Sequence, residues 1–516
     1  MRSVMHNIIF VGLLLMGNLG SSAQKISYSE VDRDDYREMN FEIIGKMGSN
    51  INIYKNYKNR HDISIYDNEM QLKNRVKFDF MPERVFTVDF VSYGDFAYML
   101  YQYQKRNIVS YAMVKINQEG KLMTDPVDLD TSHASGSNDS KVYTMITSDD
   151  KKKILLFKIR RMNDRNFQIT TMLYNQDMQL LKRSSFYFNL PDKDGVFTDF
   201  VVDNDGDLVF GRCSRSGSRE FINKVDLMFK PALSDSLEHI PITLNDKTLD
   251  EVKLKFDNYN KRLIVNSLFY QQRRGNVEGL YALVWDKKQH ALLSESSLMF
   301  DDSLRFDAKG DDGSIKTAFN DYFIRDVLPL QDGSYAVAAE LFYSSSRNNA
   351  WNRFDYLYGG YGGFISPYDM WYNYPISRMY GMGWYDPFNR FGPQNNIVRY
   401  VSENIMVFLF NEQGKLKWSN TIRKSQYDDN NDSFLSYQLF NTGSEARFLF
   451  NQRERRDLFL NSATIDADGK LKRQPTMKNL DRNYDFMPKF GKQIGLRQVI
   501  IPCVYKNYIC FAKLEL

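Results

Sequence analysis

The sequence contains few of the residues that hold metal ions or carry out nucleophilic chemistry. Among 516 residues there are three cysteines and five histidines. The histidines beyond the N-terminal segment lie far from one another and from the cysteines in the sequence: His61, His133, His239 and His290. No pair has the spacing of zinc ligands, and no G-x-S-x-G, H-E-x-x-H or Walker motif occurs. The sequence therefore predicts no metal, no cofactor and no catalytic residue.

Long hydrophobic runs are also missing. The first residues, "MRSVMHNIIFVGLLLMGNLGSSA", have a cation at Arg2, a short apolar run and small residues up to Ala23, which together predict a signal peptide over residues 1–23. No later segment reaches the roughly eighteen apolar residues that span a bilayer. No cysteine follows the predicted cleavage site, which argues against a lipid anchor. We expect export to the periplasm, the cell surface or the medium.

The charge balance gives no strong field of either sign. The chain has 68 basic and 64 acidic side chains, and removal of Arg2 with the signal peptide leaves 67 against 64. A near-neutral protein does not gather polyanions as a whole, so nucleic acid is not an expected partner. The oligomeric state is left open.

A short turn pattern is present instead and repeats along the chain. An apolar residue is followed by Asn or Asp, two polar residues, Gly or Met, Lys or Gln, and Leu. The copies are "YDNEMQL" from Tyr66, "INQEGKL" from Ile116, "YNQDMQL" from Tyr174, "FNEQGKL" from Phe410 and "IDADGKL" from Ile465. Asn or Asp and a residue with positive φ are typical of tight turns between strands, and the flanking runs are β-branched or aromatic.

The period of about 50 to 60 residues predicts an all-β fold, a β-propeller with four-stranded antiparallel blades. In each blade the repeated turn joins the third strand to the fourth. Seven units fit residues 41–80, 83–130, 141–190, 196–245, 250–302, 316–423 and 432–476. An eighth can form from the C-terminal strands and "KISYSEVD" near the N-terminus. We expect one propeller domain over residues 24–516, with eight blades, or seven as the alternative.

The C-terminal hairpin makes a separate prediction. If Lys506 and Asn507 form its loop, Cys503 faces Cys510 across the two strands. Opposed residues come within disulfide range, and export would allow oxidation. The alternative is two buried thiols that pack as small apolar groups.

Two resemblances follow from these motifs. Gly414, Lys415 and Trp418 in "GKLKW" resemble the end of the tryptophan-docking repeat of quinoprotein-type propellers, which supports the blade without implying a quinone cofactor. More broadly, the chain resembles secreted bacterial β-propeller repeat proteins of unassigned function, and this architectural resemblance covers most of its length.

One segment breaks the repeat. Residues 351–393 hold fifteen aromatic residues and seven glycines among 43, and they fall between the second and third strands of the sixth blade, in an insertion at about 347–400. Tyr and Trp offer flat rings with a polar tip, which suit a sugar or a protein partner. The candidate binding residues are Tyr356, Tyr358, Tyr361, Trp371, Tyr372, Tyr374, Trp384 and Tyr385. A structural cap over the disc is the alternative.

Charged loops flank this insertion on the same predicted face. Loops between second and third strands are basic, whereas loops between blades are acidic, so we expect the two sets to cancel. Two acidic turns, "DNDGD" at Asp203 and "DDNND" at Asp428, lack the spacing of an EF-hand and are interpreted as solvated turns. The function predicted is a non-enzymatic binding or scaffold module for a protein or cell-envelope component. The alternative is a glycan-binding or glycan-active propeller that uses carboxylates at the channel mouth.

Overall fold

The structure is a computed structural model of the chain. It describes residues 25–133, 142–163, 165–190, 196–215, 221–272, 275–311, 313–346, 353, 357, 398–429, 432–454, 457–477 and 484–515. The predicted signal peptide lies outside these residues. Among the residues described, no helix has the length and hydrophobicity to cross a membrane.

Most of the described chain is strand, and the strands form seven hydrogen-bonded antiparallel sheets. The first comprises β2 (Met39–Met47), β3 (Asn50–Tyr57), β4 (Arg60–Tyr66) and β5 (Leu72–Lys77). The second comprises β6 (Val85–Ser92), β7 (Phe96–Lys105), β8 (Ile108–Asn117) and β9 (Val127–His133). The third comprises β10 (Tyr143–Thr147), β11 (Lys153–Arg161), β12 (Asn166–Asn175) and β13 (Leu180–Asn189).

The fourth sheet is the largest, with nine strands. It comprises β14 (Val196–Val202), β15 (Leu208–Arg215), β16 (Ile222–Lys230), β17 (Glu238–Ile242), β18 (Thr248–Leu249), β19 (Lys253–Asp257), β20 (Arg262–Tyr270), β21 (Gly279–Asp286) and β22 (Ala291–Met299). The short strand β18 pairs with both β16 and β20 and so joins two runs of four strands.

Two four-stranded sheets and one five-stranded sheet follow. They comprise β23 (Tyr322–Pro329), β24 (Tyr335–Ser346), β25 (Val398–Phe410) and β26 (Leu416–Asp429); then β27 (Tyr437–Asn441), β28 (Glu445–Glu454), β29 (Asp457–Asp466) and β30 (Leu471–Met477); and last β1 (Lys25–Tyr28), β31 (Asp485–Phe486), β32 (Lys492–Gly495), β33 (Gln498–Tyr505) and β34 (Tyr508–Glu515).

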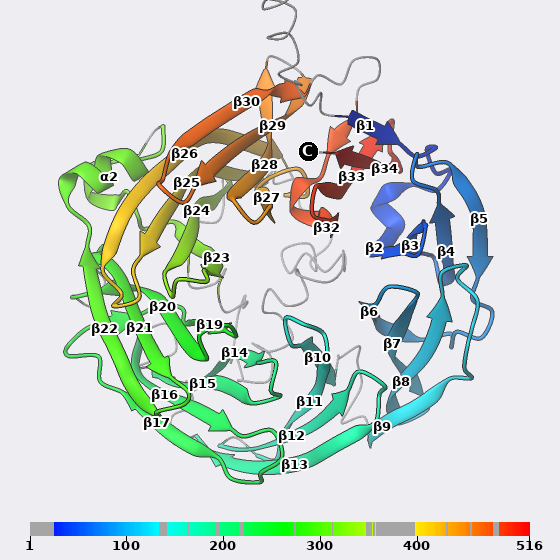
Figure 1. Cartoon of the computed structure of the whole chain (residues 1–516), viewed down its shortest axis with the longest axis horizontal. Coiled ribbons are helices and arrows are strands. Elements are labelled where there is room, and N and C mark those ends of the chain that lie inside the picture. The colour runs from blue at the N-terminus through cyan, green and yellow to red at the C-terminus, as the bar shows by residue number, and fades with distance from the viewer. Residues whose placement is uncertain are drawn as a thin grey trace, which may run out of the picture.

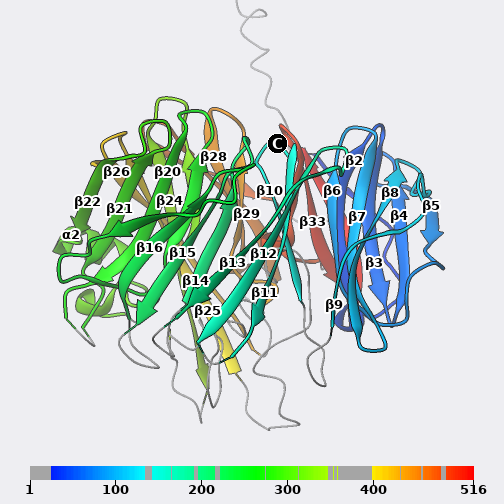
Figure 2. The same cartoon turned by 90° about the horizontal axis from the view of Figure 1, so that it is seen from below.

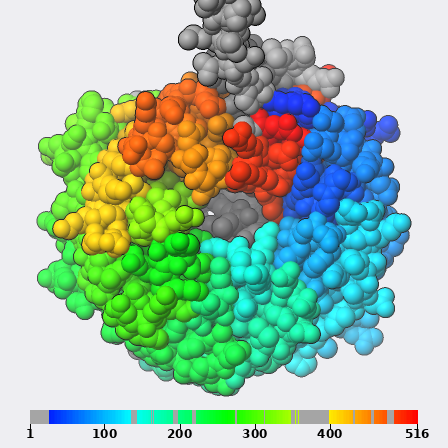
Figure 3. Space-filling model, in the orientation of Figure 1, coloured from blue at the N-terminus to red at the C-terminus, as the bar shows by residue number. Residues whose placement is uncertain are grey.

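The sheets follow one another in a ring (Figures 1 and 3). From β2 to β30, the first strand of each four-strand run is innermost and the fourth outermost, whereas in the last sheet β1 is at the outer edge (Figure 1). Apolar side chains of neighbouring sheets pack into clusters that cross from sheet to sheet; Phe41 of β2 and Phe511 of β34 share one such cluster. The fold is therefore all-β and propeller-like, as the repeat predicted, and the predicted units coincide with the observed runs of strands to within a few residues.

The repeated turns form as predicted, and the structure explains why Met can replace Gly in them. In each turn the Asn or Asp side chain accepts backbone N–H groups two and four residues later, as Asn117 does from Glu119 and Lys121 at 3.0 and 2.9 Å. The fifth residue has φ of +72° at Gly120 but also +63° at Met70 and +59° at Met178. Both methionines are buried, so packing of the side chain offsets the cost of that backbone conformation.

Trp418 in β26 lies against the corresponding turn of the next sheet. Its indole Nε1 donates to the carbonyl oxygen of Ala467 at 3.1 Å. A Cβ atom on Gly469 would come within 2.7 Å of the indole ring, so this contact requires glycine. The docking role suggested by "GKLKW" is thus present at this blade.

Both chain ends contribute to the last sheet. β1 pairs antiparallel with β34, and the chain continues along that strand, where Asp32 donates its N–H to the carbonyl of Ile509 at 2.8 Å. Lys506 and Asn507 form the hairpin loop with positive φ at both, and Cys503 lies opposite Cys510, in the predicted register.

Helices are few among the described residues. α2 (Asp302–Ala308) and the 3-10 turns η1 (Tyr36–Glu38), η2 (Ile315–Thr317) and η3 (Pro488–Phe490) lie between strands. With seven residues, α2 is too short to show a helical periodicity in the sequence. The Asp301 side chain caps it by accepting the N–H of Leu304 at 2.8 Å.

Candidate functional site

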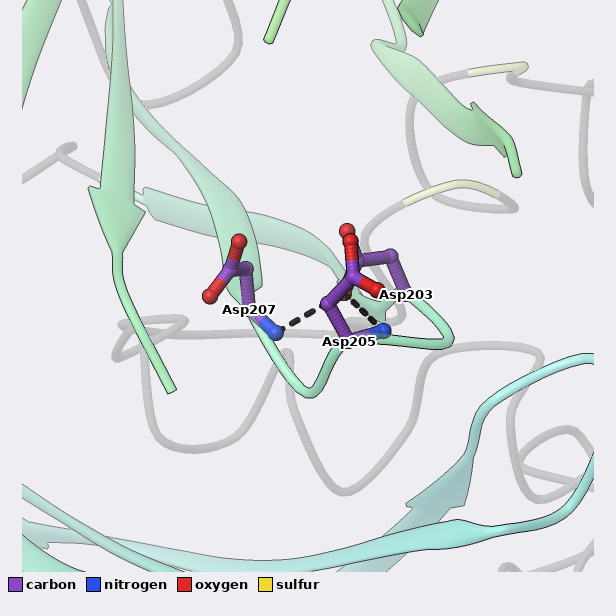
Figure 4. A group of neighbouring side chains, drawn as sticks. All are labelled: Asp203, Asp205 and Asp207. Atoms are coloured by element: carbon purple, nitrogen blue, oxygen red, sulfur yellow. Dashed lines mark hydrogen bonds between the residues drawn. The ribbon is translucent and has the colours of Figure 1, made fainter. Parts of the chain in front are cut away.

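The first acidic turn, Asp203–Asp207 between β14 and β15, gathers three carboxylates (Figure 4). The Asp203 side chain is buried, and its Oδ1 accepts the backbone N–H groups of Asp205, Gly206 and Asp207, each at 2.9 Å. Carboxylate oxygens of Asp203, Asp205 and Asp207 lie within 4.8 Å of one another, which is close enough to share a cation.

The cation in this turn is a side chain of the protein. Lys287, which follows β21, forms ion pairs with Asp203, with Asp205 at 2.8 Å and with Asp207 at 2.5 Å. Burial alone would lower the pKa of Lys287, but the three hydrogen bonds raise it. Lys261 and Lys287 together hold the pKa of Asp205 at about 2. The interpretation of this segment as a solvated turn was incomplete, because an internal ion pair joins it to β21.

Two carboxylates, of Asp199 in the inner strand β14 and of Glu251 between β18 and β19, connect successive runs of strands. Asp199 accepts the N–H of Leu254 from the next inner strand at 2.9 Å, and Glu251 accepts the N–H of Ile324 at 2.9 Å. Burial raises the pKa of both groups. Each carboxylate therefore stabilises the contact between two successive runs of strands by accepting a backbone hydrogen bond across it.

Opposite charges pair at one of the acids predicted to lie in a loop between blades, and its basic partners come from strands β11 and β13. Asp130 in β9 accepts from the ammonium of Lys158 at 2.6 Å and from the guanidinium of Arg183 at 3.1 Å. The expectation that opposite charges pair therefore holds at this position. The basic segment "NQRERRD" does not form a loop throughout, because Asn451–Glu454 is the end of β28.

The second acidic segment differs from the first, and its interpretation as a turn was wrong for Asp428 and Asp429, which are the last residues of β26 and pair with β25. A small hollow of about 230 Å³, mouth included, opens there between the β23–β26 and β27–β30 sheets. Its lining is mixed apolar and polar: Gln426, Tyr427, Asp428, Phe434, Leu435, Asn451, Arg453 and Leu458. We call it the 428 hollow. Burial raises the pKa of the Asp428 carboxyl to about 6; Arg453 opposes this increase, and Asp429 and Asp485 add to it.

Two polar atoms in the wall of the 428 hollow have no hydrogen-bond partner among the described residues. One is Oδ1 of Asn451 and the other is Nε of Arg453. The Asn451 amide donates both protons, to the carbonyls of Phe434 at 2.8 Å and Phe486 at 2.6 Å, and this fixes its oxygen as an acceptor. The residues that line the hollow therefore include one buried amide oxygen and one buried guanidinium N–H without a described partner, and one carboxyl whose pKa is raised to about 6.

An exposed aromatic ring lies at the rim. Tyr427 has the guanidinium groups of Arg399 and Arg453 over its ring, each 4.8 Å from the ring centroid. Arg399 also forms a two-bond ion pair with Asp429, at 2.8 and 3.1 Å. Arg453 lines the hollow, whereas Arg399 does not.

The strands beside this hollow carry the aromatic insertion. β24, β25 and β26 have 12, 13 and 14 residues, whereas every other described strand has ten or fewer. The ends of β24 and β25 project past the neighbouring strands in Figure 2. We call the side of the disc where β24 ends and β25 begins the insertion face. Tyr427 and Asp428 lie there, opposite Val401 and Tyr400 of β25.

Two described residues of the insertion pack onto the disc. The Arg353 guanidinium is buried, donates to Asp250 at 2.5 Å and to the carbonyl of Tyr322, and lies 3.9 Å from the ring centroid of Phe323. Leu357, four residues later, is buried in the cluster that includes Phe342 and Tyr400. The start of the insertion is therefore part of the core.

The predicted binding residues cannot be placed in the same way. Tyr356, Tyr358, Tyr361, Trp371, Tyr372, Tyr374, Trp384 and Tyr385 all lie outside the described residues. Sequence reasoning missed Lys287, Arg353 and Asn451. Two of them left a weak signal in the sequence. Asn451 is a polar residue that interrupts an apolar strand, and Lys287 is a charged residue that directly follows one.

Comparison with known proteins identifies no family for this chain. No known protein family matches the sequence, and no curated protein matches it. Solved structures that resemble it include an ulvan lyase of a polysaccharide lyase family, with 10% identity, a TM-score of 0.36 and coverage of 82% of this chain and 90% of that one. A prolyl endopeptidase has 10% identity and a TM-score of 0.41, with 92% and 55% covered.

An apocarotenoid oxygenase from Synechocystis has 9% identity and a TM-score of 0.32, with 98% and 95% covered. These neighbours are all-β, propeller-like enzymes. This chain spans about half of the prolyl endopeptidase. At such identities and TM-scores, the activities of the neighbours say nothing about the activity of this chain.

Proposed function

We propose that the protein is an exported binding module that recognises a glycan of the cell envelope on its insertion face. The observation that carries the proposal is the 428 hollow, with its oriented acceptor at Asn451 and its donor at Arg453. A sugar hydroxyl both donates and accepts a hydrogen bond and so complements this pair. The hollow is small, with room for about one hydroxyl group, so the rest of a sugar ring would lie outside it on the insertion face.

The aromatic insertion extends this surface in the proposal. It leaves the disc from β24 and returns through β25, next to Tyr427 and Asp428. Its tyrosines and tryptophans, outside the described residues, would stack on further sugar rings of the same ligand, because their rings combine an apolar face with a polar tip. A protein of the envelope is the alternative ligand for the same surface.

The proposed scaffold is one propeller of eight blades over residues 24–516, after removal of residues 1–23. Two four-strand runs within the nine-stranded sheet support the count of eight, and the pairing of β1 with β34 supports closure through both chain ends. Intact mass and N-terminal sequencing of the exported protein test the cleavage after Ala23.

A glycan-active enzyme is the second candidate function. Asp428, with a pKa of about 6, could act as a general acid near neutral pH, and its carboxyl interacts electrostatically with that of Asp485. Paired carboxyls are the catalytic groups of most glycoside hydrolases. Release of reducing ends by the wild type, together with its loss in Asp428→Asn, would favour this candidate over pure binding.

Two arginines on the same tyrosine provide a matched test. We expect Arg453→Met to weaken binding of a glycan identified on an array of envelope polysaccharides by at least tenfold, measured by calorimetry. Arg399→Met should leave affinity within twofold, since Arg399 contacts Tyr427 without lining the hollow. Equal effects of the two substitutions, or no glycan bound by the wild type, would overturn the proposal.

Deletion of the insertion tests its share of the binding surface. The deletion should begin after Leu357, because loss of Arg353 would leave Asp250 buried without its cation. We expect removal of residues 358–396 to preserve the melting temperature within a few degrees and to weaken binding. A large loss of stability would indicate the structural cap instead.

A further inference from the structure

Cys503 and Cys510 are the two cysteines that lie close together in the fold. They occupy opposed positions in the β33–β34 hairpin, with their sulfur atoms 2.9 Å apart. Both are buried, in a cluster with Leu449, Val499 and Leu514. Cys213 lies in β15 of a different sheet and has neither of them opposite it.

The hairpin holds the N-terminal segment along its outer edge. Ile26 lies opposite Leu514 in the β1–β34 pair. Ser29 then exchanges two hydrogen bonds with Phe511, at 2.9 and 3.0 Å, and the N–H of Tyr36 reaches the carbonyl of Asn507 at 3.0 Å. The whole of β34 is therefore covered by chain that begins near residue 25.

Side chains strengthen this contact farther along. Asp32 accepts from the ammonium of Lys55 in β3 at 2.6 Å and from the guanidinium of Arg75 in β5 at 3.2 Å. The N-terminal segment thus connects the last sheet to the first, and we call residues 25–36 the seam segment. The seam segment hydrogen-bonds to β34 and to the hairpin loop, so it can dock only when the β33–β34 hairpin is formed.

We propose that Cys503 and Cys510 are a modification site, oxidised to a disulfide that cross-links the hairpin on which the seam segment docks. The oxidant would be a protein disulfide in the export compartment. One cysteine thiolate attacks that disulfide, and the second displaces the resulting mixed disulfide. One sulfur–sulfur bond forms in the hairpin, the oxidant is reduced to two thiols, and the two protons of the cysteines end on those thiols.

Burial fixes the order of these events. Thiol–disulfide exchange needs access to the attacking sulfur, and neither thiol is accessible in the folded chain. Oxidation therefore precedes packing of the last sheet and docking of the seam segment. The cross-link removes conformations of the open hairpin, so docking of β1 finds its partner strand already in register.

Counting thiols tests the modification directly. The full chain, with its leader, is produced by secretion, purified without reductant, denatured and treated with N-ethylmaleimide. We expect one label of three, on Cys213, and a peptide joining Cys503 to Cys510 that is 2 Da lighter than the dithiol. Cys213→Ser should give no label and Cys503→Ser two. Three labels in the wild type would overturn the proposal, as would a bridge to Cys213.

Hydrogen exchange tests the consequence for the seam segment. In the oxidised protein the amide of Asp32 should exchange at least fivefold more slowly than in the Cys503→Ala/Cys510→Ala variant, whereas the amide of Phe210 in β15 should not differ. Equal rates at Asp32 would show that the bridge does not stabilise the seam and would overturn that part of the proposal.

Discussion

The two acidic turns have similar sequences and opposite electrostatics. "DNDGD" and "DDNND" both suggest solvated turns. In the structure, lysines hold the pKa of Asp205 at about 2, whereas burial raises the pKa of Asp428 to about 6. The difference comes from the neighbouring strands: Lys287 reaches into the first turn at ion-pair distance, while Arg453 faces the second across a hollow. Partners from distant residues decide whether such a turn is a structural joint or a surface able to bind.

Removal of Lys287 should have the largest effect on this comparison. Lys287→Met leaves Asp203 buried without its cation, and breaking a buried pair costs about 3–5 kcal/mol in free energy of unfolding. Urea unfolding measures this loss. Lys288→Met, at the exposed next position, should change the free energy by less than about 0.5 kcal/mol.

The response to Ca²⁺ is a second measurement on the Lys287→Met variant. Without the ammonium, three carboxylates remain within 4.8 Å, which is a set of oxygen ligands for a divalent cation. We expect Ca²⁺ to raise the melting temperature of Lys287→Met by mass action and to leave that of the wild type unchanged. A wild type that responds to Ca²⁺ as strongly as the variant would contradict the view that Lys287 fills the turn.

Asp428→Asn should have a medium effect that depends on pH. The folded carboxyl keeps its proton up to about pH 6, whereas the unfolded one releases it near 3.8. The folded state therefore binds more protons between these values, and the free energy of unfolding falls as pH rises through this window. Asp428→Asn removes the fall and should be more stable than wild type at pH 7, by about 2 kcal/mol once the full conversion of the pKa shift is reduced for the part of the carboxyl that solvent screens.

Asp429→Asn is the control for that measurement. Its hydrogen bonds to Arg399 lower the pKa of Asp429, so the sign reverses. Stability from this carboxylate is present above its ordinary pKa and is lost as pH falls through the lower folded value. If Asp429→Asn flattened the stability profile between pH 4 and 6 as Asp428→Asn should, the assignment to Asp428 would be wrong.

The parts of the fold that the sequence predicted depend on local chemistry. The turn at Asn117 needs only a side-chain acceptor and a residue with positive φ, and both stand within seven residues of sequence. The opposition of Cys503 and Cys510 follows from a two-residue loop in the same way.

The contacts that could not be predicted from the sequence join residues that lie far apart along the chain. Lys287 meets Asp203 across more than eighty residues, and Asn451 is fixed by carbonyls of two other segments, at Phe434 and Phe486. No spacing rule in one sequence relates such residues. Arg353 was visible only as one of six charges in an aromatic segment, and its partner Asp250 lies about a hundred residues earlier, between β18 and β19.

Asp205→Asn should have the smallest effect on the free energy of unfolding. The size of this effect shows how much Asp205 contributes to holding the first turn together. Asp205 is half exposed, and Lys287 keeps both Asp203 and Asp207 as partners after the substitution. An exposed pair contributes about 0–1 kcal/mol, so the free energy of unfolding should fall by less than 1 kcal/mol, and less again in high salt. Because the pKa of Asp205 is lowered to about 2, its carboxylate contributes its stabilisation fully above pH 3.8, the ordinary pKa. This stabilisation is lost as the pH falls toward 2. A cost equal to that of Lys287→Met would mean that all three carboxylates act as one unit around the ammonium. A small cost means that the buried pair with Asp203 provides most of the stability, and within the described part of the chain the acidic segment at Asp428 in β26 has no such pair with a lysine.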